Sequence, residues 1–268
     1  MAHPKTLPAT VLFGSPSALY DAAEAVAQPH YGSRSGDADF YGTQTWAEAI
    51  ELARKGWKAG VEQAYTLADK LSARLVASLS RPEIVYDVQG DMFDLGRVME
   101  DTPEAWMVWD TSQEGEQDAS QTAPVTVIVN NGARSEATAE ALIRKGAAVV
   151  ATVIVLEAAG RTVQVKVGTR CAEGLEHLTL AKRWYEPLQA DGLAFLVMHP
   201  AAHRRINFAI RRAQGLESSG SSVPLKQAQG DIYIGHASEN ARIWASDKAA
   251  EAQVRAWLVA QGVQFNDY

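Results

Sequence analysis

The stretch from Val125 to Gly168 constrains the fold more than any other part of the chain. It opens with residues 125–129, whose sequence Val-Thr-Val-Ile-Val is typical of a buried strand in the middle of a parallel sheet. The polar residues 130–135, Asn-Asn-Gly-Ala-Arg-Ser, then interrupt the strand and precede a long apolar segment. This order predicts a central strand that runs through a tight turn into a helix.

The helix expected over residues 136–159 has almost no polar side. Beyond its first two turns, nearly every position is Ala, Val, Ile or Leu, so the rest of the protein must cover it on most sides. Gly160 ends the helix, and residues 162–167 alternate as a second strand. The three elements predict a βαβ unit, in which a right-handed crossover joins two parallel strands.

Composition limits the class of protein to which this unit can belong. The chain has 268 residues, 47% of them hydrophobic, with a net charge of −7 and a single cysteine. The negative net charge argues against a protein whose whole surface attracts nucleic acid. A single cysteine excludes an internal disulfide. The longest apolar run, residues 146–156, is too short for a bilayer span of about 20 residues. With no signal segment recognised, these features predict a cytoplasmic protein without a membrane role.

The chain divides into three parts by composition. Residues 1–110 are expected to form a helix-rich region packed on the core, in which Thr45 and Glu48 make a capping box at the start of a helix. Residues 111–123 contain Ser, Gln, Glu, Asp and Thr without a large apolar residue, which predicts a flexible acidic loop. Residues 124–268 are expected to form the α/β domain.

The second half continues with further strands and helices. A third strand is expected over residues 177–184, helices over residues 191–198 and 201–214, a strand over residues 231–235, and a final amphipathic helix capped by Asp247. This order predicts an α/β fold with a Rossmann-like, doubly wound sheet that has helices on both faces.

The succession of strand, polar turn, apolar helix, Gly160 and second strand resembles that of von Willebrand factor A-like domains, over roughly residues 124–264. In that family, a D-x-S-x-S motif at the end of the first strand supplies one carboxylate and two hydroxyls to a divalent metal. Here the carboxylate is missing, and Arg134 in the same turn would repel a cation. The resemblance therefore implies a degenerate A-like domain with no metal and no cofactor. The chain is also similar to uncharacterised proteins of bacteriophage and prophage origin.

The turn after the first strand is one candidate site. Where a parallel strand leads into a helix, backbone N–H groups can hold a phosphate or a carboxylate. The candidate ligand-binding residues are Asn130, Asn131, Gly132, Arg134 and Ser135. Neither glycine-rich phosphate-binding motif is present, so we favour a second interpretation, in which the asparagines shape the turn and Ser135 caps the helix.

The helix expected over residues 201–214 is the other candidate site. At 100° per residue, four arginines lie on one side of an ideal α-helix around Phe208. These are Arg204, Arg205, Arg211 and Arg212. Such a face could contact nucleic-acid phosphates with Phe208 stacked on a base, or dock on an acidic protein surface. We favour a more ordinary role, a solvated face with exposed ion pairs.

Side chains that could carry catalysis are not grouped in the sequence. Cys171 follows a strand beside Arg170, but no His or Asn partner can be assigned to it, which favours an exposed thiol without a catalytic role. His199 and His203 are four residues apart, but Pro200 between them breaks the helix that would align their rings on a metal. We therefore expect no catalytic residue and no metal ligand.

These observations favour a non-enzymatic binding or assembly protein of phage or prophage origin, with a protein partner or a second copy of itself. The alternative is a nucleic-acid-associated phage protein that uses the arginine face. A third interpretation is an enzyme with a nucleotide-like ligand at the Asn130 turn. Both the host-cell cytoplasm and the virion are compatible locations for the first interpretation.

Overall fold

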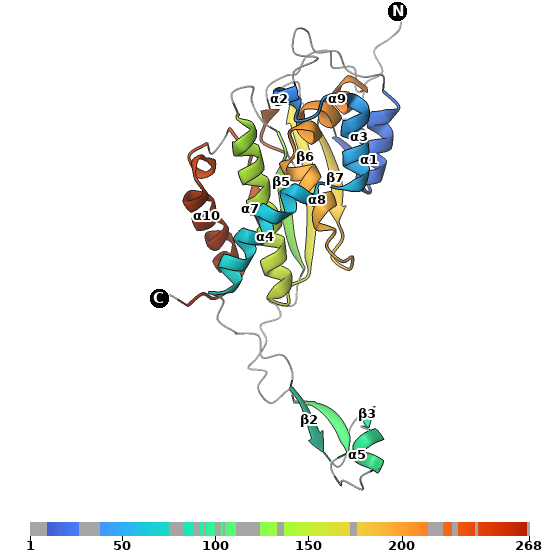
Figure 1. Cartoon of the computed structure of the whole chain (residues 1–268), viewed down its shortest axis with the longest axis vertical. Helices are drawn as coiled ribbons and strands as arrows, with labels where there is room; N and C mark the ends of the chain where they lie inside the picture. Colours follow the sequence, from blue (N-terminus) through green and yellow to red (C-terminus); the bar gives the residue numbers. More distant parts are fainter. Residues whose placement is uncertain are drawn as a thin grey trace, which may run out of the picture.

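The computed structural model contains two β-sheets, a large one packed against helices and a small one (Figure 1). The residues that it describes are 10–26, 38–74, 83–87, 92–93, 95–99, 103, 105–110, 124–132, 137–171, 176–213, 222–226, 230–238 and 241–266. Among these residues, no helix combines the length and the hydropathy needed to cross a bilayer.

The main sheet is mixed and mostly parallel. Its strands are β1 (Thr10–Phe13), β5 (Val125–Asn130), β6 (Val163–Cys171), β7 (Glu176–Lys182), β8 (Ser222–Val223) and β9 (Ile232–Ile234). The order is β1-β7-β6-β5-β9, and β8 pairs with the end of β6. β5 is parallel to both β6 and β9, β1 is parallel to β7, and β7 is antiparallel to β6. Since helix α7 (Ala139–Ala158) joins β5 to β6, the βαβ unit and the coarse α/β architecture are confirmed.

Helix α7 lies at the centre of the packed body, as its apolar sequence requires. Thr138 caps its first turn by accepting a hydrogen bond from the Ala141 N–H at 3.2 Å. Twelve of its 20 residues are buried, because α4 (Lys58–Ser72), α8 (Ala190–Met198) and α10 (Asp247–Ala260) pack around it. Gly146 allows the close approach of α8, since a Cβ atom there would lie 2.1 Å from Met198 Cγ and 2.5 Å from Met198 Cα.

The described helices that pack against the main sheet cover one of its faces and not both (Figure 1). Val127 and Val165 on that face belong to the same apolar cluster as the helices. Ile128 and Leu178 alternate to the other face, where they cluster with Leu225 and with no described helix. The prediction of helices on both faces is therefore wrong for the described residues. The reason is that β6 is followed by an antiparallel strand, whereas a second parallel strand would have required another crossover helix.

The boundary expected at residue 124 does not separate two domains. β1 joins the main sheet beside β7, and the helices α1 (Pro16–Glu24) and α3 (Trp46–Lys55) contribute to the same apolar core as α7. α3 begins with the predicted capping box, in which Thr45 Oγ1 accepts a hydrogen bond from the Glu48 N–H at 3.1 Å. These N-terminal elements complete the α/β body, because the sheet and core are shared across the expected boundary.

The small sheet consists of β2 (Glu83–Asp87), β3 (Met92–Phe93) and β4 (Trp106–Asp110), in the antiparallel order β2-β4-β3. The short helices are α2 (Ala38–Tyr41), α5 (Leu95–Met99) and the 3-10 helix η3 (Ile243–Ala245). Among the strands that the structure describes, none of the small sheet pairs with the main sheet. Residues 1–110 therefore contribute both helices that pack on the core and a small sheet. The loop predicted over residues 111–123 lies outside the described residues.

Candidate functional site

The carboxyl ends of β5, β6 and β9 and the start of β7 meet at one edge of the main sheet, because β7 runs antiparallel to the other three. The turn after β5 lies at this edge. Asn130 Oδ1 accepts a hydrogen bond from the Gly132 N–H at 2.9 Å, and Asn130 Nδ2 donates to the Val223 carbonyl at 2.9 Å. The Asn130 side chain therefore shapes the turn and joins it to β8.

Asn131 has a similar structural role on the helix-covered side of the sheet. Its Nδ2 donates to the Leu196 carbonyl at 2.6 Å, which connects the turn to α8. Both asparagines are buried, as the interpretation of a structural turn requires. Arg134 and Ser135, the other predicted residues of this site, lie outside the described residues.

The predicted arginine face is not exposed to solvent. Its residues belong to the π-helix η2 (Ala202–Ile206) and to α9 (Asn207–Ala213). A π-helical turn shifts the phase that an ideal α-helix would have, and residues 201–211 are all buried. Arg204, Arg205 and Arg211 are only 5%, 4% and 2% exposed, whereas Arg212 is exposed. The prediction of a solvated arginine face available to nucleic acid is therefore wrong.

Two of the buried arginines form hydrogen bonds that hold neighbouring segments of the chain against this edge. Arg204 donates to the Phe40 carbonyl at 2.6 Å and to the Ala137 carbonyl at 2.7 Å. Arg205 donates to the Thr43 hydroxyl at 2.8 Å and to the Thr43 carbonyl at 2.9 Å. These hydrogen bonds fix α2, the residues after it and the start of α7 against η2.

Arg211 and Phe208 face the interior of the body. Arg211 donates to Thr169 Oγ1 at 2.8 Å, and its guanidinium lies 5.8 Å from the Phe208 ring centre. Phe208 is 7% exposed and lies edge-on to the His203 ring at 5.6 Å, so it is a packing residue that does not stack on a base. Cys171, expected as an exposed thiol, is buried at the end of β6.

Buried polar side chains from the strand ends, α7, η2 and α9 gather at this edge, and we call them the edge cluster. Its members are Asn131, Lys145, Thr169, His177, His203, Arg204, Asn207 and Arg211, each at most 5% exposed. Lys145 Nζ donates to the Asn130 carbonyl, and His177 Nε2 lies 3.2 Å from Asn207 Oδ1. The structure thus brings together the turn and the arginine helix, which the sequence presented as two separate candidate sites.

Burial and neighbouring cations keep the two histidines of the edge cluster neutral. Burial is the largest cause that lowers the pKa of His203 well below its usual value, and the charge of Arg211, then those of the other nearby cations, lowers it further. Burial followed by the charge of Arg211 lowers the pKa of His177 to about 4, against the opposing effect of its hydrogen bond with Asn207. At neutral pH each ring therefore has one nitrogen that donates and one that accepts.

The sequence offered little to identify Lys145, His177 and Asn207. One signal was available for Lys145, which lies three residues after Leu142 and four before Val149, on the buried stripe of α7. A charged residue on such a stripe indicates a buried polar contact. Among the described residues, no group of three or more His, Cys, Asp or Glu side chains could hold a metal ion.

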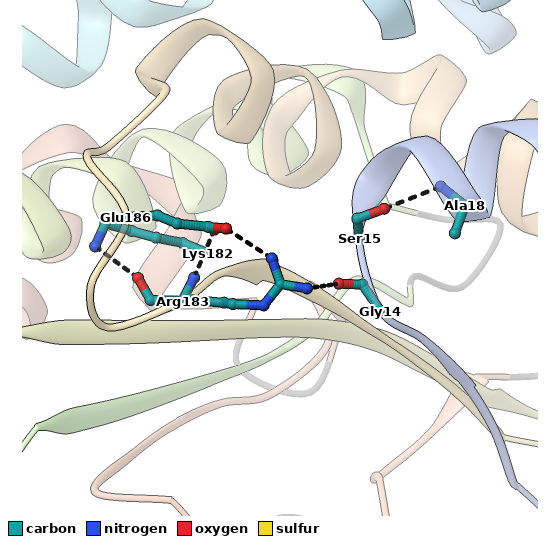
Figure 2. Close-up of polar contacts among 6 residues, drawn as sticks. All are labelled: Gly14, Ser15, Ala18, Lys182, Arg183 and Glu186. Carbon is teal, nitrogen blue, oxygen red and sulfur yellow. Dashed lines mark hydrogen bonds and ion pairs between the residues drawn. The ribbon is translucent and has the colours of Figure 1, made fainter.

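A surface feature lies at the opposite edge of the sheet, in the turn after β7 (Figure 2). Arg183 Nη1 donates to Glu186 Oε1 at 2.6 Å, and Arg183 Nη2 donates to the Gly14 carbonyl after β1 at 2.9 Å. Lys182 at the end of β7 is buried and forms an ion pair with Glu157 of α7 at 2.6 Å. These contacts fix the turn to β1 on one side and to α7 on the other.

Two large aromatic side chains project from this turn, which we call the aromatic turn (residues 183–186). Trp184 and Tyr185 are 51% and 62% exposed, and their ring centres lie 5.2 Å apart in an edge-to-face arrangement. The strand predicted over residues 177–184 ends at Lys182, which leaves the aromatic pair beyond the sheet. Sequence reasoning missed this pair, because a strand would have buried one of the two rings.

The family model described as "Domain of unknown function (DUF7192)" matches residues 7–264 of the chain. No curated protein and no solved structure matches the chain. The family match spans both the edge cluster and the aromatic turn.

Proposed function

The chain belongs to the DUF7192 family, and we propose that it is a protein-binding protein whose contact surface is centred on the aromatic turn. The observation that carries the proposal is the pair of exposed rings, Trp184 and Tyr185. Exposed tryptophan and tyrosine side chains supply large apolar area and a polar atom, and they are enriched among the residues that contribute most binding energy at protein interfaces.

The rigidity of the turn supports the same proposal. Arg183 holds Glu186 through its guanidinium at 2.6 Å and through its backbone N–H at 3.2 Å, and it also donates to Gly14 (Figure 2). A surface that is already ordered before binding loses less conformational entropy when the partner arrives. The aromatic rings are therefore presented by a preorganised element.

The surface beside the turn is also suited to a protein partner. Leu12 of β1, two residues before Gly14, is 68% exposed. β1 lies at the end of the strand order of the main sheet, with β7 as its strand partner among the described residues. An edge strand with an exposed apolar side chain, connected at its end to the aromatic turn by the hydrogen bond from Arg183 to Gly14, matches a partner that presents apolar side chains, with or without an added strand.

The nucleic-acid function considered from the sequence receives less support. Three of the four arginines expected to contact nucleic acid are buried and hold the fold together. The resemblance to von Willebrand factor A-like domains, the phage origin and the cytoplasmic location stay predictions.

A pair of matched variants tests the proposal. The double variant Trp184→Ala/Tyr185→Ala removes the exposed pair, and Tyr65→Ala removes an aromatic ring that is 47% exposed on α4. Self-association is measured by sedimentation equilibrium, and capture of native-host proteins is compared quantitatively among the three chains. We expect the double variant to lose the self-association or the captured partner, and Tyr65→Ala to retain it. Equal binding by all three chains would contradict the proposal.

A further inference from the structure

We propose that an open cavity between α2, the start of α3 and the turn that joins α8 to η2 is a binding site for a small amine that also carries a hydroxyl group. The cavity has a volume of about 400 Å³, within the range of natural small-molecule sites. It shares no residue with the aromatic turn. Its polar and aromatic lining residues are Asp39, Thr43, Gln44, Glu48, Trp57 and His199.

His199 is the feature of this cavity that points to a ligand. Its side chain is only 7% exposed, and its ring is stacked on Phe195 at 5.4 Å and lies edge-on to Trp57 at 4.8 Å. The Ala201 N–H donates to His199 Nδ1 at 3.1 Å, so the neutral ring carries its proton on Nε2. This Nε2–H has no hydrogen-bond partner among the described residues. The wall of the cavity therefore contains a fixed donor that is available to an oxygen atom of a ligand.

Two carboxylates give the cavity a negative lining. Glu48 Oε2 accepts hydrogen bonds from the Gln44 N–H at 2.7 Å and the Thr45 N–H at 3.4 Å, which hold the carboxylate at the start of α3. Within the described part of the chain, Glu48 Oε1 has no hydrogen-bond partner and the exposed Asp39 forms no ion pair. An ammonium group can donate to both carboxylates at once, and such charge-assisted hydrogen bonds are stronger than neutral ones.

The neighbouring cations lie behind the lining residues. Arg204 and Arg205 are at most 5% exposed, and both donate to backbone carbonyls of the chain before α3. Burial lowers the pKa of His199 to about 4, against the opposing effect of the charge of Glu48, so the ring is neutral at pH 7. Among the described residues that line the cavity, a ligand therefore meets two carboxylates and no positive charge.

These groups together select one class of ligand. The carboxylates suit an ammonium group, the His199 Nε2–H suits a hydroxyl oxygen, and the Trp57 ring attracts an organic cation. A small anion would be repelled by the carboxylates. A bare metal ion would use neither the His199 donor nor the aromatic ring. An amino alcohol or an amino sugar carries the ammonium and hydroxyl groups that the cavity can recognise.

Thermal unfolding of the wild-type chain with added small molecules tests the site. The probes are ethanolamine, glucosamine and glucose, at a pH at which both amines are protonated and at equal ionic strength set with sodium chloride. We expect both amines to raise Tm and glucose to leave it unchanged. A larger rise with glucosamine would indicate a ligand that fills the cavity, and an equal rise would indicate recognition of the amino-alcohol group alone. Equal responses to glucosamine and glucose, or no response to either amine, would overturn the proposal.

A pair of matched variants locates the effect. Glu48→Gln removes the charge from the cavity, while glutamine at this position can still complete the capping box. Glu51→Gln removes the same charge from the same helix outside the cavity, where Glu51 pairs with Lys55. By isothermal titration calorimetry, we expect Glu48→Gln to weaken ethanolamine binding about tenfold and Glu51→Gln to leave it unchanged. Equal affinities in the two variants would contradict a site at Glu48.

A direct measurement needs no variant. The ring nitrogens of His199 in the ¹⁵N-labelled wild-type chain are followed by NMR during titration with ethanolamine and, separately, with glucose. Saturable shifts of the His199 nitrogens with ethanolamine alone would support the site. Unchanged shifts, or the same shifts with glucose, would exclude it.

Discussion

Helix α7 is buried along most of its length, but two stretches of it lie in different chemical surroundings. From residue 147 to 156 it is enclosed by apolar side chains of the sheet, α4, α8 and α10. Two residues before this stretch, Lys145 is just as deeply buried, at 1% exposure, within the edge cluster. The packing of residues 147–156 depends on shape, because apolar contacts are non-directional. The contacts of Lys145 depend on the direction of each hydrogen bond.

The comparison shows two ways in which the same body is stabilised. Apolar packing loses stability when side-chain volume is added or removed, and the loss is larger where the neighbouring atoms lie closer. A polar cluster fails when one partner is deleted, since the other partners stay buried without their hydrogen bonds. Four experiments sharpen this contrast, and the first two carry the largest expected effects.

Adding one methyl group at the contact between α7 and α8 tests the apolar half. A Cβ at Gly146 would lie 2.5 Å from Met198 Cα, so the two helices must separate. We expect Gly146→Ala to lower the free energy of unfolding in urea by about 3 kcal/mol. Gly192→Ala in α8 is the matched control, because no atom lies within 4 Å of its Cβ position. It should be neutral or stabilising. Equal effects of the two changes would show that the helices are not closely packed at Gly146.

Lowering the pH tests the polar half. Because burial lowers the pKa of His177 to about 4 from its ordinary value of 6.5, the unfolded chain binds a proton that the folded chain excludes. Stability from this residue is complete above pH 6.5 and is lost as the pH falls towards 4, by about 3 kcal/mol. Unfolding in urea at a series of pH values measures this loss. The variant His177→Gln should show a shallower dependence between pH 6.5 and 4, and an unchanged slope would contradict this origin.

Removing one buried arginine tests how much its hydrogen bonds to a loop contribute to the free energy of unfolding. Arg205→Met preserves much of the side-chain volume but leaves the Thr43 carbonyl and hydroxyl without their donor. We expect a loss of about 2 kcal/mol in the free energy of unfolding. The comparison variant is Arg54→Met, which removes the surface ion pairs with Asp21 and Glu24 and should have a much smaller effect, because exposed ion pairs contribute little to stability. A larger loss of stability in Arg54→Met than in Arg205→Met would contradict a stabilising role for the buried hydrogen bonds of Arg205.

The smallest effect is expected at Arg212, which is exposed on the same helix as the buried Arg211. Arg212→Gln should change the free energy of unfolding by no more than about 0.5 kcal/mol. Thermal unfolding of this variant beside Arg211→Gln measures the difference directly. Similar losses in the two variants would mean that burial does not distinguish the two arginines.

The sequence predicted the elements whose pattern is local. The β-branched run of β5, the apolar α7 and the capping box at Thr45 and Glu48 are all found where they were expected. In each case, neighbouring residues along the chain contain the physical reason for the element. The strand β1 was missed, because its four residues are paired by β7, which lies more than 160 residues away.

The candidate site was predicted less well than the fold. Asn130 and Asn131 were identified as turn residues, but the arginines were placed on a solvated face by an ideal helical wheel. The π-helical turn at residues 202–206 and the enclosure of the segment by other elements changed which side chains face the interior. Neither feature has a signature in the spacing of the arginines.

By itself, the amino-acid sequence determined that a βαβ unit with a deeply covered helix must exist, because β-branched and apolar runs have a single stable environment in water. Only the tertiary structure decided that the helices cover one face of the sheet, that Lys145, His203 and Arg211 share one buried site, and that Trp184 and Tyr185 remain exposed. The physical reason is range. Backbone propensity and hydrophobic periodicity act over a few residues, whereas the burial of a charge or the exposure of a ring depends on segments that meet only after the chain has folded.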